Sequence, residues 1–144
     1  MKIHSAEEAA GLIPDGATIA VAASGGGLLE ADTIMAAIEA RFLATGHPRD
    51  LTLVHALGFG DRGRRGANRF AHEGMVKRVI GGHWTWSRPM QELARNEKIE
   101  AYSLPGGVIS LLLRESGAGR PGLITKTGLG TFADPRLQGG RVNT

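Results

Sequence analysis

Four short glycine clusters stand where apolar runs of this sequence end. They are Ser24-Gly25-Gly26-Gly27, Gly58 to Gly60, Gly81-Gly82 and Pro105-Gly106-Gly107. Glycine has no Cβ, so its backbone can turn sharply and approach a ligand closely, and a helix that begins beside such a turn offers free N–H groups. These loops could hold a phosphate or the oxyanion of an acyl-transfer intermediate. For the first cluster, a purely steric role in a strand-to-helix turn stays open.

Familiar catalytic motifs are missing from the sequence. It contains neither GxxxxGK[ST] nor a GxSxG elbow, and the first glycine cluster lacks the spacing of GxGxxG. The histidines are not at metal-ligand spacings and no cysteine could complete a site, so we expect no metal. Three glutamates have ordinary explanations as helix-start, salt-bridging and surface residues, namely Glu30, Glu73 and Glu115. The residues alone therefore predict a binding platform with no catalytic group in this chain.

A basic segment follows the second glycine cluster. Its cations are Arg62, Arg64, Arg65, Arg69, Lys77 and Arg78. They could meet phosphates of a nucleotide-like ligand or of nucleic acid. The alternative is a solvated loop whose arginines pair with Asp61 and Glu73. Trp84 and Trp86 could stack on a base, or pack at an interface.

The elements that must position these loops can be predicted from periodicity and end signals. Ser5 and Glu8 have capping-box spacing for a short first helix. The stretch from Ala17 to Phe42 reads as a strand, the glycine turn and then a helix, which Gly46 and Pro48 stop. Leu51 to Leu57 is a near-continuous apolar strand, typical of a parallel sheet covered on both faces.

The second half continues the alternation. We predict a strand over Val76 to Ile80, a helix from Ser87 to about Glu97 with Ser87 as its cap, and a strand over Ile99 to Leu104. A further helix starts at Pro105-Gly106-Gly107 and a last short strand covers Gly122 to Thr125. This order predicts an α/β fold with an open, mostly parallel sheet and helices on both faces. Ligands bind outside the carboxyl ends of such strands, where the four glycine clusters gather.

Length and composition set the outer limits. A chain of 144 residues is one domain, residues 1–144, by the usual size range. The absence of cysteine excludes a disulfide scaffold and fits a cytoplasmic protein. No signal peptide or membrane-spanning run is apparent, so we expect no membrane association. A net charge of +3 does not demand nucleic acid as a partner, and we expect none.

The succession of motifs resembles the leading part of family I CoA-transferases, the acetate and 3-oxoacid type, with the short-chain acyl-CoA transferases as the nearest subgroup. The resemblance rests on four stretches that occur in the family's order: PDGATIAV with the glycine loop, GDRGRRGANRFAHEGMVKRVIGGHW, NEKIEAYSLPGGVIS and GLGTFADPRLQGGRVN. It covers the chain from about Ser5 to Asn143.

This resemblance implies an enzyme that moves coenzyme A between a short-chain acyl-CoA and a carboxylic acid such as acetate or a 3-oxoacid. It implies acyl-CoA and the acid as substrates, no permanently bound cofactor, and a place in short-chain fatty acid or ketone body metabolism. In the family, a glutamate attacks the thioester and a glutamyl-CoA thioester forms. That glutamate belongs to the second half of the pattern, which this chain lacks.

Several expectations about the site and the assembly follow. The family match assigns Gly25, Gly26, Gly27 and the turn Pro105-Gly106-Gly107 to the substrate and oxyanion loops, beside Ser24 and Gly58. We expect the isolated chain to be inactive, to need a C-terminal half or a β-subunit-like partner, and to form an oligomer. The family usually has glutamine where Gly106 stands, so an amide is missing here. That departure keeps open the alternative of a catalytically inactive module for binding or assembly.

Overall fold

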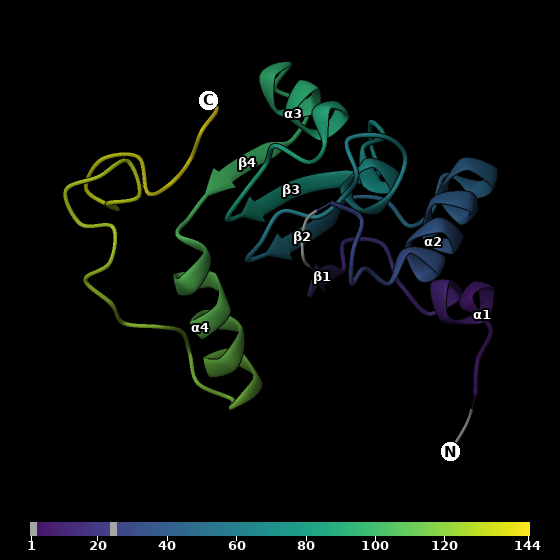
Figure 1. Cartoon of the computed structure of the whole chain (residues 1–144), viewed down its shortest axis with the longest axis horizontal. Coiled ribbons are helices and arrows are strands. Elements are labelled where there is room, and N and C mark those ends of the chain that lie inside the picture. Colours follow the sequence, from purple (N-terminus) through teal and green to yellow (C-terminus); the bar gives the residue numbers. More distant parts are fainter. Residues whose placement is uncertain (1–2, 24–25) are drawn as a thin grey trace.

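The computed structural model describes residues 3–23 and 26–144. Four parallel strands form one sheet in the order β1-β2-β3-β4: β1 (Thr18–Ala20), β2 (Leu51–His55), β3 (Val76–Gly81) and β4 (Glu100–Ser103). The elements between and around them are α1 (Ala6–Gly11), α2 (Asp32–Thr45), the 3-10 helix η1 (Gly66–Phe70), α3 (Arg88–Arg95) and α4 (Gly106–Gly117). The arrowheads of β2, β3 and β4 point to the same side in Figure 1. The predicted open α/β fold is therefore confirmed.

One face of the sheet carries the apolar core. Ile19, Leu53, Val79 and Ala101 stand side by side in the register of the four strands. Leu53, Val79 and Ala101 belong to the same buried cluster as Met35 and Ile38 of α2 and Met90 and Ala94 of α3, and Ile19 packs against it. Because right-handed crossovers between strands in sequential order put their connections on one face, α2, η1 and α3 all cover this side.

The opposite face is only partly covered. Its register row runs through Ala20, Val54, Ile80 and Tyr102, of which only Val54 is buried. Helix α4 leaves the end of β4 and packs on this face, where it buries Ile109. The helices thus lie on both faces, but the second layer is the thinner one (Figure 1).

Local signals in the sequence explain the helix ends. The Ser5 hydroxyl oxygen accepts a bond from the Glu8 N–H and the Glu8 carboxylate accepts one from the Ser5 N–H, which completes the predicted capping box. Ser87 caps α3 by accepting a bond from the Met90 N–H. Gly46 ends α2 with a left-handed φ of 75°, as predicted.

Two predictions about the elements are wrong. Helix α2 begins only at Asp32, so residues 28–31 separate the first glycine cluster from the helix start, and N–H groups of α2 do not lie at that turn. The residues 122–125 form no strand, because nothing in the described part of the chain pairs with them and Ile124 is fully exposed.

The last part of the chain leaves the sheet and returns to it. Residues 120–139, which we call the arm, contain turns but no helix or strand, and Figure 1 shows them looping away from the sheet beyond α4. The chain then returns to the edge of β4, where Arg141 pairs with Tyr102 and the Val142 N–H bonds to the Ala101 carbonyl. None of the helices among the described residues is long and apolar enough to span a membrane.

Candidate substrate site at the carboxyl edge of the sheet

The glycine clusters do gather at the carboxyl edge of the sheet. Ser24 and Gly25, two of the predicted site residues, lie outside the described residues. Gly26 and Gly27 have φ values of 83° and 76°, which only glycine adopts readily. A side-chain carbon at Gly26 would lie 3.7 Å from the Trp86 ring, and one at Gly27 would lie 3.2 Å from Cβ of Asp61. The first cluster therefore contacts the loops that follow β2 and β3.

Gly58 occupies the centre of this group of loops. A side-chain carbon there would clash with Nδ1 of His83 and with the Trp86 ring, so only glycine fits. The Trp86 ring in turn lies under the Arg62 guanidinium, 4.9 Å from it, in a cation–π contact. Trp84 takes a different direction and packs against the core beside His55, so the two tryptophans do not form one stacking platform.

The third and fourth clusters meet at the Ala56 carbonyl. A side-chain carbon at Gly106 would lie 2.6 Å from this oxygen, and one at Gly82 would clash with it. Pro105 is the N-cap of α4 and provides no side-chain bond, so the N–H groups of Gly106 and Gly107 open the helix uncapped. The start of α4, the positive end of its dipole, thus lies beside Ala56 and Gly82.

Carboxylates near the start of α2 hold the loop after β2 in place. Glu30 Oε1 accepts a 2.6 Å bond from the Gly60 N–H, and Asp32 Oδ1 accepts a 3.0 Å bond from the Gly66 N–H. Arg69 bridges Asp32 and Glu39 with contacts of 2.8 Å, and its guanidinium lowers the pKa of Asp32. Glu30 is therefore a loop-anchoring residue, and the predicted helix-start role is wrong.

The arginines of the basic segment do not form ion pairs with Asp61 and Glu73, their predicted partners, in the described part of the chain. Asp61 accepts bonds from the backbone N–H groups of Gly63 and Arg65, which lower its pKa, and makes no ion pair among the described residues. Glu73 is a salt-bridging residue, as predicted, but its partner is Lys98 at 2.9 Å. The prediction of Glu115 as a surface residue is also wrong, because its buried carboxylate pairs with Arg114 and Arg120.

His55 is a buried residue at this edge that the sequence did not single out for a role. It ends β2, and Nδ1 lies 2.9 Å from the Leu57 carbonyl oxygen, so Nδ1 carries the proton and donates. Burial lowers the pKa of His55, and His83 lowers it further. Its ring lies between Phe59 and Trp84, where a neutral imidazole fits the apolar surroundings. His55 follows Leu53 by two residues, so it lies on the same face of β2, and this spacing could have revealed its inward orientation.

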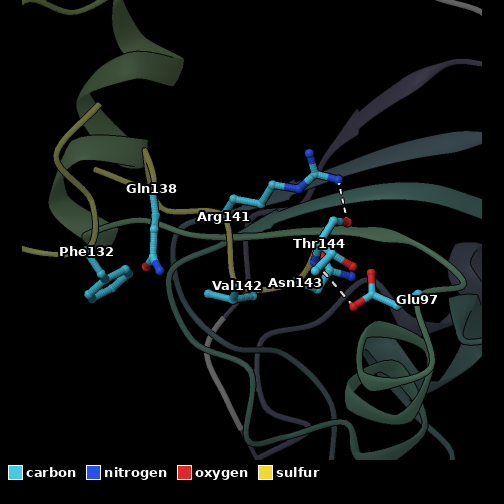
Figure 2. A pocket seen from close by; sticks show the side chains of 7 residues that line it. All are labelled: Glu97, Phe132, Gln138, Arg141, Val142, Asn143 and Thr144. Atoms are coloured by element: carbon cyan, nitrogen blue, oxygen red, sulfur yellow. Dashed lines mark hydrogen bonds between the residues drawn. The ribbon is translucent and has the colours of Figure 1, made fainter. Parts of the chain in front are cut away.

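Two cavities lie near α3 and the end of the chain, and one of them is lined by Trp84, Thr85 and Ser103 close to the glycine loops. Figure 2 shows one of about 690 Å³ between α3 and the end of the chain, lined by Glu97, Phe132, Gln138, Arg141, Val142, Asn143 and Thr144. There Arg141 donates to the Thr144 carbonyl and the Thr144 N–H donates to Glu97. No three metal-ligating side chains cluster in the described part of the chain.

Comparison with known proteins gives a consistent picture. Residues 3–142 match the family model described as coenzyme A transferase. The chain is 46% identical over 141 residues to the acetate CoA-transferase YdiF of Escherichia coli K12, and 48% identical over 143 residues to the caffeate CoA-transferase of Acetobacterium woodii. These matches cover 98% and 99% of this chain, but only 27% of each relative.

Solved structures agree with the sequence matches. The apoenzyme of the acyl-CoA transferase YdiF from E. coli O157:H7 superposes with a TM-score of 0.93 at 44% identity, over 99% of this chain and 28% of that one. A thioester complex of that protein with CoA has the same TM-score over 98% of this chain. A variant of the decarboxylase AibA/AibB, at 24% identity and a TM-score of 0.60 over 82% of this chain, shares the fold alone.

Proposed function

The chain belongs to the coenzyme A transferase family, and we propose that it forms the substrate-facing loops of an enzyme that moves coenzyme A between a short-chain acyl-CoA and a carboxylic acid such as acetate or a 3-oxoacid. The observation that carries this proposal is the match over residues 3–142 combined with glycine loops that meet at one sheet edge. Acetate and caffeate are the acids in the names of the relatives, and we propose acetate as the first acid to test.

The proposed contribution of this chain is electrostatic. Attack of a carboxylate on a thioester carbonyl turns the carbonyl oxygen into an oxyanion, which N–H donors stabilise when they are already in place. Gly26, Gly27, Gly58 and the Gly106-Gly107 start of α4 supply backbone N–H groups without side chains that would block the approach. We place the nucleophilic glutamate in a part of the enzyme outside this chain, as the family pattern implies.

Three glutamates considered from the sequence support that division of labour. Glu30 and Glu115 are engaged in anchoring a loop and in ion pairs with arginines, and Glu73 pairs with Lys98. A nucleophile must be free to leave its partners and reach the substrate, so none of the three is a good candidate.

A second candidate is a module that keeps the fold but has lost the chemistry. Gly106 favours it, because the amide that the family usually has there is missing. The close approach of the Ala56 carbonyl also leaves no room for a longer side chain at position 106 without a shift of the loop.

The deciding experiment follows labelled acetate into acetyl-CoA. It compares the isolated chain with a chimera in which this chain replaces the matched segment of the E. coli K12 relative. We expect no transfer by the isolated chain and measurable transfer by the chimera. Borohydride trapping followed by peptide mass analysis should place the adduct in the E. coli part. Transfer with an adduct on the isolated chain would contradict the proposed position of the glutamate, and a folded but inactive chimera would favour the second candidate.

A further inference from the structure

We propose that His55 and Trp84 are positioning residues for the coenzyme A transfer: the Trp84 Nε1–H donates a hydrogen bond to Nε2 of His55, and this bond sets the two loops that flank Gly58. The statement about the reaction rests on the proposed function. The hydrogen bond is a property of this chain alone, and neither side chain has to touch the substrate.

The indole N–H of Trp84 is a buried donor in need of an acceptor. Its nitrogen is fully buried, and it has no hydrogen-bond partner among the described residues. Buried polar groups in folded proteins are nearly always paired, because a donor that leaves water without gaining an acceptor costs free energy. An acceptor for Trp84 should therefore lie close by.

Nε2 of His55 is an acceptor of the required kind. The residue is 4% exposed, and the hydrogen bond described for its ring joins Nδ1 to the Leu57 carbonyl oxygen at 2.9 Å. Because a carbonyl oxygen only accepts, Nδ1 carries the proton, and in the neutral ring Nε2 then bears a lone pair. Burial lowers the pKa of His55, which keeps the ring neutral at neutral pH.

Gly81 brings the two nitrogen atoms to one place. A side-chain carbon at Gly81 would lie 2.6 Å from Nε2 of His55 and 3.1 Å from Nε1 of Trp84. The two rings meet edge to face, with 6.3 Å between their centroids. Gly81 has no left-handed φ, so glycine is needed here for space and not for its backbone angles. Donor and acceptor thus meet over a residue whose side chain would keep them apart, and the bond closes when the indole turns toward the imidazole.

This bond connects the loops on the two sides of Gly58. His55 holds the carbonyl of Leu57, the residue just before Gly58, through its Nδ1. Trp84 belongs to the segment 83–86, whose side chains at both ends pack so closely on Gly58 that only glycine fits there. Fixing Trp84 against His55 therefore fixes the position of Gly58, one of the proposed N–H donors. An oxyanion donor acts only when it is already in place, so a lost bond should slow the reaction.

Nuclear magnetic resonance of the 15N-labelled chain tests the bond without any substitution. The chain has two tryptophans, so the spectrum should contain two indole N–H signals. At pH 7.5 we expect a scalar coupling across the hydrogen bond between Nε1 of Trp84 and Nε2 of His55, and no such coupling for Trp86. If both nuclei give signals and no coupling joins them, the proposal is wrong.

Transfer kinetics of the chimera with the E. coli K12 relative test the positioning role. His55→Phe removes the acceptor and Trp84→Phe removes the donor, while both keep an aromatic ring. We expect each to lower kcat with acetate by at least about tenfold and to change KM by less than about twofold, because displaced N–H donors act on the transition state. His4→Gln, at an exposed position, is the control and should keep the kcat of the parent.

The double variant shows whether the two side chains act through one bond. His55→Phe combined with Trp84→Phe should be about as slow as either single variant, since the second substitution removes nothing that the first has left. Losses in kcat that multiply in the double variant, or a rise in KM alone, would overturn the positioning role. If a variant does not fold, the coupling in the parent chain still decides whether the bond exists.

Failure of the proposed function has a different signature. A folded parent chimera without transfer activity would contradict the proposed function, and the positioning role with it. The scalar coupling in the isolated chain does not depend on activity, so its presence would confirm the hydrogen bond and its absence would refute it.

Discussion

Gly106 approaches the Ala56 carbonyl so closely that a side-chain carbon at position 106 would lie 2.6 Å from that oxygen. At Gly107, the next residue, nothing lies within 4 Å of the same position. We therefore expect Gly106→Ala to lower the free energy of unfolding by about 1 to 3 kcal/mol, because backbone atoms must shift to admit the methyl group. Urea denaturation of the isolated chain measures this change.

Gly107→Ala is the matched control on the same helix turn. It adds the same methyl group in open space and reduces the freedom of the unfolded chain, so it should raise stability by about 0.4 to 1 kcal/mol. Equal effects of the two substitutions would show that the approach to Ala56 does not constrain the loop.

Arg69 carries the ion pairs that join α2 to η1. Its guanidinium contacts Asp32 and Glu39 at 2.8 Å, and its side chain is 21% exposed, so solvent screens these contacts only in part. We expect Arg69→Gln to cost about 2 kcal/mol in the free energy of unfolding, through loss of charge-assisted hydrogen bonds. Arg64→Gln, on the exposed part of the same loop, should stay within about 0.5 kcal/mol of the parent. If both variants unfold at the same urea concentration, the ion pairs contribute nothing measurable.

His55 gives the fold a pH dependence. Burial lowers its pKa below the ordinary value of 6.5, so the unfolded chain takes up its proton at a higher pH than the folded chain does. Stability should therefore fall as the pH drops from about 6.5 toward the lower, folded pKa, and be unaffected by this group above that window. Between pH 7.5 and pH 5, the free energy of unfolding should fall less for His55→Gln than for the parent. His4→Gln, at an exposed position, is the control and should lose as much stability as the parent between these two pH values. If His55→Gln also loses as much as the parent, His55 is not the source of the pH dependence.

Asn143 fastens the end of the chain to α3 and β4. Its Nδ2 donates to the carbonyls of Ala94 and Ile99, and its Oδ1 accepts from the Ala101 N–H, with distances of 3.0, 2.7 and 3.0 Å. We expect Asn143→Ala to reduce the free energy of unfolding by about 1 to 3 kcal/mol, because these backbone groups lose partners. Asn96→Ala, at the exposed end of α3, is the control and should change the free energy of unfolding little. An equally small change for Asn143→Ala would show that Asn143 does not hold the end of the chain. Thermal or urea denaturation distinguishes the two.

The parts of the fold that local signals determine were predictable from the sequence. The Ser5–Glu8 capping box, the Ser87 cap and the glycine stop at Gly46 each depend on residues within a few positions of one another, and all three are present. The gathering of the glycine clusters followed from parallel strands, whose carboxyl ends share one edge.

What could not be predicted depended on partners distant in the sequence. Nothing near Arg69 in the sequence indicates Asp32 and Glu39 as its partners, because they lie 37 and 30 residues before it, on α2. The residues 122–125 have β-forming side chains but no neighbouring strand, so their propensity has no hydrogen-bonding partner to act on. The helix-start role of Glu30 is wrong because α2 begins at Asp32, two residues after Glu30. The Glu30 carboxylate instead accepts a bond from the Gly60 N–H.

The order of the strands in the sheet is also their order along the chain. Each strand after the first pairs with the one made just before it during synthesis, so no strand has to wait for a partner still inside the ribosome. The sheet can therefore grow by one edge at a time as the polypeptide emerges, with β4 the last strand to join.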